Sequence, residues 1–139
     1  MHPVVWPFQS SLREVDSLEL AYAPYPSFDD MAWYGLAFSR VHELFDLEGF
    51  LRVAKDLFHW CWDKGWDTSG QCEGGVWFDQ NQNYKGTIEN AQLYALGMKL
   101  ARFSSDKAER EAFISKAEKL WNFLTKATGL LDPANFKVL

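Results

Sequence analysis

The stretch Thr87-Ile-Glu-Asn-Ala-Gln-Leu-Tyr-Ala-Leu-Gly-Met-Lys-Leu-Ala-Arg-Phe103 decides the fold class, because its apolar residues fall on almost every side of a helix. A helix that is apolar all round has to be covered by neighbouring elements. The segment from about 28 to 45 is of the same kind, and one of its faces carries at helical spacing Trp33, Ala37, Val41 and Phe45. We therefore expect two helices that lie mostly inside the protein.

Two further segments, from about 47 to 63 and from about 106 to 126, are predicted to be amphipathic helices, each with one side exposed to solvent. Gly129 is expected to stop the second of them. The two segments echo each other at a constant offset: the residues Phe50, Ala54, Leu57 and Phe58 recur as Phe113, Ala117, Leu120 and Trp121. Self-similarity of this kind is typical of stacked helical hairpins.

The alternation of dry and amphipathic helices predicts an all-α fold whose dry helices form an inner layer, as in an α/α toroid. A right-handed solenoid of helical pairs gives the same pattern, and periodicity does not separate the two. Two hairpins do not close a ring, so the inner helices are expected to keep an exposed flank. We expect the chain to be part of a longer toroid, with an oligomer or a fortuitous repeat as the alternatives.

The composition is that of one globular domain, with 139 residues, 47% of them hydrophobic and 24% charged. A net charge of −5 disfavours a nucleic-acid or anionic-membrane partner. No apolar run approaches the ~20 residues of a membrane span, and the first residues show no signal-peptide pattern. Because four of the five prolines precede residue 28, we divide the chain into a Pro-rich lead (1–27), with one helical turn around Ser11–Ala21, and a helical domain (28–139).

Asp29 and Asp30 are the first candidate for chemistry, and they allow two interpretations. With Ser27 as N-cap, both fall in the first turn of a helix, where negative charge is favourable and Asp30 occupies the capping-box position. Spacing alone favours this capping role. Two carboxyls of adjacent helical residues can also sit about 5 Å apart, the separation that retaining glycosidases use. The proton donor of such a pair needs a drier or more negative setting than its neighbour.

The Gly-rich segment from 65 to 86 supplies the second candidate, since its glycines let the backbone approach a ligand closely. Within Glu73-Gly-Gly-Val-Trp-Phe78, Trp77 and Phe78 could form a stacking platform for sugar rings, or they could plug the core beside a tight turn. The chain is rich in such rings, with 7 Trp, 5 Tyr and 11 Phe.

The third candidate is Lys85, just before a predicted helix, together with Asn90 inside that helix. A buried asparagine needs partners, which are either neighbouring backbone groups or the hydroxyls of a ligand. The remaining reactive residues carry no assignment. Cys61 and Cys72 lack metal-ligand spacing, and a disulfide between them is left open. The histidines, expected at the surface or half-buried, are given no role: His2, His42 and His59.

In combination, three segments resemble glycoside hydrolase family 76, the endo-α-1,6-mannanases. They are Phe28-Asp-Asp-Met-Ala-Trp33, Gly74-Gly-Val-Trp-Phe78 and Tyr84-Lys-Gly-Thr-Ile-Glu-Asn-Ala91. The closing stretch Trp121-Asn-Phe-Leu-Thr-Lys-Ala-Thr-Gly-Leu-Leu131 is also similar to the family. The resemblance covers residues 28 to about 132, the middle part of a whole family member. It implies an (α/α)6 toroid, incomplete in this chain.

The resemblance also implies an activity: retaining hydrolysis of α-1,6-linked mannan, with no metal and no cofactor. Asp29 matches the nucleophile and Asp30 the acid/base. The implied substrate-binding residues are Trp33, Gly74, Gly75, Trp77, Phe78, Lys85 and Asn90. Family members are commonly secreted, periplasmic or held at the cell surface.

The sequence departs from the family pattern in a few places. Phe78 stands where many members have a second tryptophan, Gly86 where asparagine is common, and Glu73 interrupts a run of glycines. These departures leave the fold intact and bear on substrate detail. Two rival functions remain: another toroid carbohydrate enzyme such as an epimerase, and a non-catalytic helical module that binds carbohydrate or protein.

Overall fold

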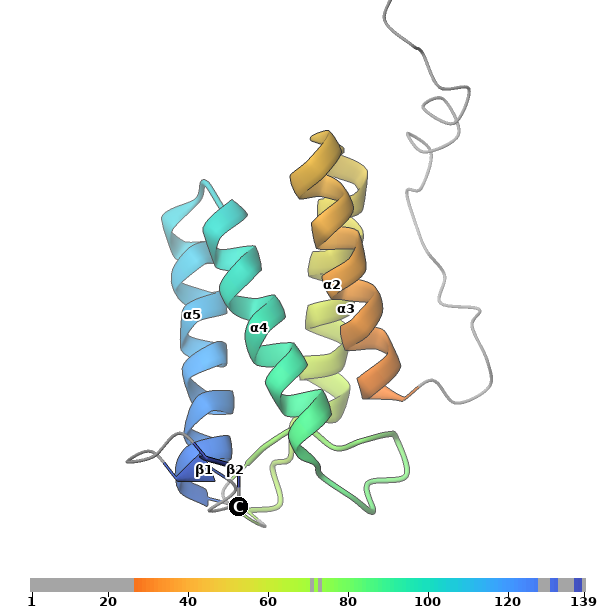
Figure 1. The fold of residues 1–139 in the computed structure, drawn as a ribbon. Helices are drawn as coiled ribbons and strands as arrows, with labels where there is room; N and C mark the ends of the chain where they lie inside the picture. The colour runs from red at the N-terminus through yellow and green to blue at the C-terminus, as the bar shows by residue number, and fades with distance from the viewer. Residues whose placement is uncertain (1–26, 71, 73, 128–130, 133–136, 139) are drawn as a thin grey trace, which may run out of the picture.

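A computed structural model of the chain describes residues 27–70, 72, 74–127, 131–132 and 137–138. In these residues the chain forms four α-helices: α2 (Phe28–Phe45), α3 (Glu48–Gly65), α4 (Thr87–Phe103) and α5 (Lys107–Asn122) (Figure 1). A π-helical turn, η2 (Phe123–Ala127), continues α5. The short strands β1 (Leu131–Asp132) and β2 (Lys137–Val138) then pair antiparallel, a ladder that the sequence did not predict.

The helix positions agree with the sequence prediction to within a few residues, and the all-α class is confirmed. Two expectations lie outside the described residues, namely the helical turn around Ser11–Ala21 and the stop at Gly129. The division at residue 27 stays a prediction. Within the described part, none of the helices combines the length and apolarity that a bilayer span requires.

The four helices form two hairpins that pack side by side (Figure 1). α2 packs against α3, α4 packs against α5, and α2 and α4 contact each other between the hairpins. α3 and α5 also meet, because the ring of Phe58 lies 5.1 Å from that of Phe113 in a T-shaped contact. The dry helices α2 and α4 thus lie together, as the alternation predicted.

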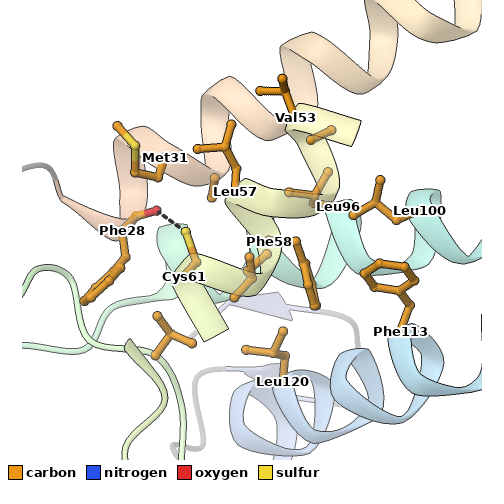
Figure 2. Close-up of a cluster of buried hydrophobic side chains, with 14 of the residues drawn as sticks. Phe28, Met31, Val53, Leu57, Phe58, Cys61, Leu96, Leu100, Phe113 and Leu120 are labelled. Carbon is orange, nitrogen blue, oxygen red and sulfur yellow. Dashed lines mark hydrogen bonds between the residues drawn. The ribbon is translucent and has the colours of Figure 1, made fainter. Parts of the chain in front are cut away.

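The core is continuous across all four helices (Figure 2). Phe28, Leu57, Phe58 and Leu96 are almost completely buried. Burying each such side chain contributes roughly 1.5–3 kcal/mol, so this cluster is the main source of stability. Cys61 is part of it, with its Sγ donating to the carbonyl of Phe28 at 3.7 Å, and burial raises the pKa of its thiol. The disulfide left open above is absent, since Cys61 and the exposed Cys72 are both free thiols.

The buried face of α2 is not the one carrying the spaced residues noted above. Trp33 and Phe45 on that face are 57% and 67% exposed. The core instead receives Phe28, Met31, Ala32, Gly35, Ser39 and His42. Because α2 is apolar around most of its circumference, spacing does not distinguish its faces. The close approach of α4 does, since Leu96 fills the space next to Gly35.

The internal echo holds at its centre and differs at both ends, since Phe50 is half-buried whereas its counterpart Phe113 is buried. Ala54 and Leu57 are buried, as are Ala117 and Leu120. The last pair differs, because Phe58 is fully buried whereas Trp121 is 42% exposed and contacts Tyr94. The inner helices also keep apolar side chains that are exposed, namely Trp33, Tyr34, Leu44, Phe45, Ile88 and Met98. The sequence predicted such a flank.

A charge cluster adds to the contact between α2 and α4. Glu43 on α2 binds Arg40 on its own helix and both Lys99 and Arg102 on α4. Hydrogen bonds from Arg40 and Lys99, with Arg102 adding to them, lower the pKa of Glu43 to about 2. The carboxylate therefore stays ionised under nearly all conditions in which the chain is folded.

The packing of Gly35 against α4 predicts the effect of adding one methyl group. A Cβ at position 35 overlaps the Cδ2 atom of Leu96, which is fully buried and has little room to move. We expect Gly35→Ala to lower the free energy of unfolding by about 1–3 kcal/mol, as overpacked cores do. Urea unfolding followed by helical CD measures this.

The double variant Gly35→Ala, Leu96→Ala is the control for this prediction. Leu96→Ala alone leaves a cavity and costs about 2–5 kcal/mol. The new methyl group occupies part of that cavity. The double variant should therefore lose less free energy of unfolding than the two single variants lose in sum. Strict additivity would contradict the steric explanation.

Candidate active site

The first turn of α2 brings Asp29 and Asp30 to one end of the hairpin pair. Ser27 caps the helix, because its Oγ accepts a hydrogen bond from the Asp30 N–H at 3.0 Å. The same hydroxyl donates to Oδ2 of Asp30 at 2.8 Å. The capping interpretation is thus confirmed for Ser27, and the positive end of the helix dipole favours both carboxylates.

The two carboxylates lie in contrasting surroundings. Asp30 is exposed and held by Ser27. Asp29 is half-buried, and its Oδ1 is buried with no hydrogen-bond partner among the described residues. A buried carboxylate oxygen without a donor is costly, so such atoms are often reserved for a ligand or a proton. Asp29 therefore has the drier setting of the two.

A third carboxyl, that of Glu89 on α4, faces Asp29 from the neighbouring helix. Glu89 is only 1% exposed, and its Oε1 accepts the N–H of Gly86 at the start of α4. Burial raises the pKa of Glu89, and the charge of Asp29 raises it further, although the N–H of Gly86 acts in the opposite direction. Two carboxyls that share a site retain a proton more readily than one alone.

The segment after Val76 joins the first turn of α2 through backbone hydrogen bonds. The N–H of Phe28 donates to the carbonyl of Phe78 at 2.8 Å, and the N–H of Phe78 donates to the carbonyl of Tyr84 at 2.7 Å. The rings of Phe78 and Tyr84 lie 6.2 Å apart and are both exposed. Trp33 follows Asp29 and Asp30 by one helical turn, so its exposed ring lies on the same side of α2.

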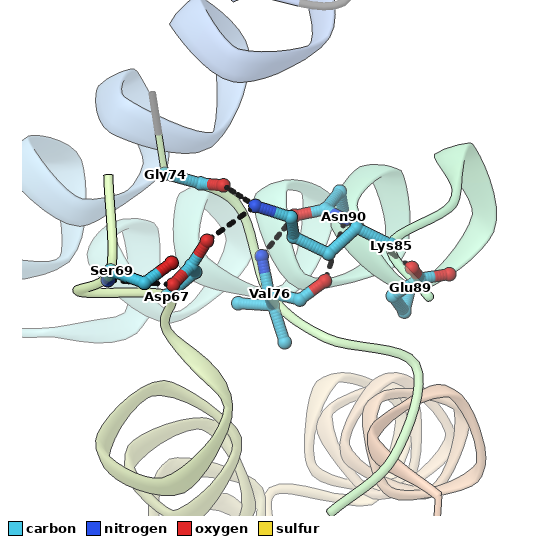
Figure 3. A network of polar contacts seen from close by, with 7 residues as sticks. All are labelled: Asp67, Ser69, Gly74, Val76, Lys85, Glu89 and Asn90. Carbon is cyan, nitrogen blue, oxygen red and sulfur yellow. Dashed lines mark hydrogen bonds and ion pairs between the residues drawn. The ribbon is translucent and has the colours of Figure 1, made fainter. Parts of the chain in front are cut away.

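Asn90 fastens this segment to α4 (Figure 3). Its Oδ1 accepts the N–H of Val76 at 2.7 Å, and its Nδ2 donates to the carbonyls of Val76 at 3.0 Å and Gly86 at 2.8 Å. The side chain is completely buried. Of the two partners considered from the sequence, the structure shows the neighbouring backbone.

Lys85 is fixed in the same way by a buried ion pair (Figure 3). Its Nζ lies 2.6 Å from Oδ2 of Asp67 and donates to the carbonyl of Gly74 at 2.7 Å. Burial tends to raise the pKa of Asp67, but the hydrogen bonds from Lys85 and Ser69 outweigh it, so the pKa lies below its usual value. The pair holds the two ends of the Gly-rich segment together.

Trp77 and the two glycines belong to the packed base of the segment. Trp77 is 9% exposed, and the ammonium of Lys85 lies 4.6 Å from the centre of its ring. Gly74 and Gly75 have φ values of 107° and 84°, which disfavour other residues. Their close approach is to the rings of Trp66 and Phe123. Trp77 therefore plugs the core, while Phe78 stays at the surface.

The predicted site residues thus separate into two groups. Asp29, Asp30, Trp33 and Phe78 lie at or near the surface around the first turn of α2. The others form a scaffold beneath them, with their polar groups bonded within the chain: Gly74, Gly75, Trp77, Lys85 and Asn90. Among the described residues, the side chains that could together hold a metal ion lie at the other end of α2, away from this site.

Sequence reasoning missed Glu89, Asp67 and Tyr84. The signal for Glu89 was its position three residues after Gly86, where an acidic side chain completes a capping box. Nothing in the sequence connected Asp67 with Lys85, because their contact depends on how the segment between them folds.

Comparison with known proteins agrees with this architecture. Residues 9–139 match the family described as glycosyl hydrolase family 76. A Schizosaccharomyces pombe protein provisionally named a mannan endo-1,6-alpha-mannosidase is 29% identical over 120 residues, which are 79% of this chain and 26% of that protein.

Solved structures show the same fold. A family 76 glycoside hydrolase from a bovine Bacteroides thetaiotaomicron strain superposes with a TM-score of 0.66 and 23% identity, covering 82% of this chain and 23% of that one. An inactive α-1,6-mannanase variant of Salegentibacter sp., with two consecutive aspartates changed to asparagine and α-1,6-mannotriose bound, gives 0.65 and 26%, covering 78% and 30%. The chain spans about a quarter of the length of these relatives.

The ion pair beneath the site leads to a stability prediction. Lys85→Met leaves the buried carboxylate of Asp67 without its counter-charge, so we expect a loss of about 3–5 kcal/mol in the free energy of unfolding near neutral pH. The loss should shrink as the pH falls through the ordinary aspartate range, because Asp67 of the variant can then become protonated. Urea unfolding at several pH values measures this. Lys64→Met, at an exposed lysine of α3, is the control, and an equal loss there would contradict the role of the pair.

Proposed function

Since the chain belongs to glycosyl hydrolase family 76, we propose that it forms part of a glycosidase that hydrolyses α-1,6-linked mannan by a retaining mechanism. Asp29 and Asp30 are its two carboxylates in this proposal, and it requires neither a metal nor a cofactor. The protein is placed outside the cell or at the cell surface, as the family resemblance implies.

One observation carries the proposal: two consecutive aspartates occupy contrasting surroundings beside exposed aromatic rings. Asp29 has a buried oxygen without a hydrogen-bond partner in the described part of the chain, whereas Asp30 is exposed and held by Ser27. The Salegentibacter mannanase variant, inactive with two consecutive aspartates exchanged, supports the same pair as the reactive groups. That variant holds α-1,6-mannotriose, which supports an α-1,6-linked mannoside as the substrate class.

In the mechanism, Asp29 attacks the anomeric carbon while Asp30 protonates the departing glycosidic oxygen. A covalent glycosyl ester on Asp29 results. Asp30, now ionised, then removes a proton from water, which attacks the anomeric carbon. The bond between that carbon and the Asp29 oxygen breaks, and the product leaves with its configuration retained. The proton taken from water restores Asp30 to its acid form for the next cycle.

Glu89 explains how Asp29 can be the nucleophile despite its drier surroundings. Dry surroundings favour the role of proton donor for the carboxyl on which the proton resides, and this need not be Asp29. Glu89 is more deeply buried, and its raised pKa makes it the carboxyl that retains a proton when both are close. Glu89 therefore offers the more favourable place for a proton, and the proposal assigns the attack on carbon to Asp29.

The rings of Trp33, Phe78 and Tyr84 form the proposed contact surface for sugar rings. Each ring is exposed, and the carbonyl of Phe78 accepts a hydrogen bond from the N–H of Phe28, the first residue of α2. Flat apolar rings beside carboxylates suit the apolar faces of mannose units. The buried residues Lys85 and Asn90 contribute by holding Phe78 and Gly74 in place.

A non-catalytic carbohydrate-binding module is the second candidate, favoured by the capping bonds between Ser27 and Asp30. In that case both aspartates serve only the helix. The two functions differ in what loss of either carboxylate does to activity and to stability.

We expect Asp29→Asn and Asp30→Asn, made singly in a full-length version of the protein, each to reduce hydrolysis of α-1,6-mannan by at least about 10²-fold, because each removes one essential carboxylate. Stability should change by less than about 1 kcal/mol, the size of a helix-dipole effect. Reducing-end release and thermal unfolding, measured on the same samples, check both points. Asp63→Asn, at an exposed position of α3, is the matched control.

The outcomes separate the two functions. A parent chain that binds mannan without cleaving it, with equal binding by both variants, supports the binding module. If hydrolysis falls only in proportion to stability, the capping role suffices. A mechanism-based inhibitor followed by peptide mass spectrometry assigns the roles, since the glycosyl adduct is expected on Asp29 and an adduct on Asp30 reverses them.

The burial of Glu89 predicts a specific pH dependence. The folded chain keeps a proton on Glu89 at pH values where the unfolded chain has released it, so this residue lowers stability as the pH rises above the ordinary glutamate pKa. Glu89→Gln keeps the acceptor for Gly86 and removes the charge. We expect the variant to gain stability over the parent from about pH 4 upward, levelling off above the raised pKa. Urea unfolding across this range measures the difference.

The exposed Glu118→Gln on α5 is the control for this series and should show no such gain. Asp29→Asn should also narrow the pH window, because it removes the neighbouring charge that raises the pKa of Glu89. Identical pH profiles for the Glu89 and Glu118 variants would contradict the account of Glu89.

A further inference from the structure

The turn between α2 and α3 gathers three potential metal ligands far from the aspartate pair. His42 lies in the last turns of α2, Asp46 follows the helix, and Glu48 begins α3. Ligand atoms of the three side chains all lie within 4.8 Å of one another. Asp29 is thirteen residues before His42 on the same helix, which separates the two sites by roughly 20 Å.

His42 is the distinctive member of this cluster. Its side chain is 8% exposed, and its buried Nδ1 has no hydrogen-bond partner among the described residues. The ring of Phe103 packs against the imidazole in a T-shaped contact, with the two ring centroids 5.1 Å apart. A buried imidazole nitrogen without a partner is rare in native structures and calls for a ligand.

The two carboxylates of the cluster form no ion pair with another described residue. No ion pair within the described part of the chain involves Asp46 or Glu48, whereas nearby Glu43 is surrounded by Arg40, Lys99 and Arg102. The C-terminal end of α2 adds negative partial charge at this point. Asp46 is held in place by its backbone, with φ of 53° and its N–H bonded to the carbonyl of His42 at 2.8 Å.

We propose that His42, Asp46 and Glu48 bind a divalent transition-metal ion of the zinc class, which links the end of α2 to the start of α3. An imidazole with two carboxylates suits Zn²⁺ or its neighbours better than Mg²⁺ or Ca²⁺, which prefer all-oxygen ligands. Ligand atoms of a tetrahedral zinc site are about 3.4 Å apart, so small side-chain rotations suffice to close the cluster on the ion. Water completes the coordination.

The test is calorimetric titration of Zn²⁺ into the chain carrying Cys72→Ser, because the exposed thiol of Cys72 is a competing ligand. One ion should bind per chain, with much weaker binding of Mg²⁺ and Ca²⁺, and the Tm should rise with Zn²⁺ concentration. The double variant Asp46→Asn, Glu48→Gln should weaken Zn²⁺ binding by more than about tenfold. Both positions are exposed, and asparagine tolerates the backbone conformation of residue 46.

His42→Gln should give the same loss, and His59→Gln is its matched control, since His59 is a half-buried histidine outside the cluster. If His42→Gln does not fold, the double variant decides, because it leaves the core untouched. Absence of Zn²⁺ binding in the Cys72→Ser chain, unchanged binding in the double variant, or an equal loss in His59→Gln each overturns the proposal. Because none of these measurements involves mannan, they are independent of the proposed hydrolase activity.

Discussion

The side chain of Asn90 accepts the N–H of Val76 and donates to the carbonyls of Val76 and Gly86, at the point where the long Gly-rich segment meets α4. The rest of the site depends on these bonds. With Val76 fixed, Trp77 falls into the core and Phe78 comes to the surface, since neighbouring residues of an extended segment point to opposite sides. Phe78 then accepts the N–H of Phe28, which sets the position of the first turn of α2 and its aspartates.

The same arrangement gives each carboxyl a different environment. Glu89 lies in the interior because α4 begins at the base of the clamped segment, and its proton is retained by burial and by the charge of Asp29. Asp29 stands between this interior and the surface, and Asp30 lies outside with Ser27. A gradient from dry to wet across three acidic groups is a general means of dividing acid and nucleophile roles among chemically similar side chains.

The helices and the presence of an aromatic-rich site could be predicted from the sequence because both depend on local pattern. α4 is apolar on nearly all sides, which predicts a buried helix. Ser27 precedes two acidic residues, which predicts the start of a helix. What could not be predicted depends on contacts between distant segments. Whether Trp77 or Phe78 faces the ligand, and whether Asn90 meets backbone or sugar, follows from how the 66–86 segment crosses the helix ends. The buried face of α2 likewise depends on Leu96 meeting Gly35.

The acidic side chains at the two ends of α2 lie in different electrostatic surroundings. At its N-terminal end the helix dipole favours the carboxylates of Asp29 and Asp30. At its C-terminal end the dipole disfavours the carboxylate of Asp46, whereas Glu48 lies at the favourable N-terminal end of α3. Because the two carboxylates lie close together, they repel one another unless a cation joins them. A bound ion at that end removes the repulsion and fixes the α2–α3 turn.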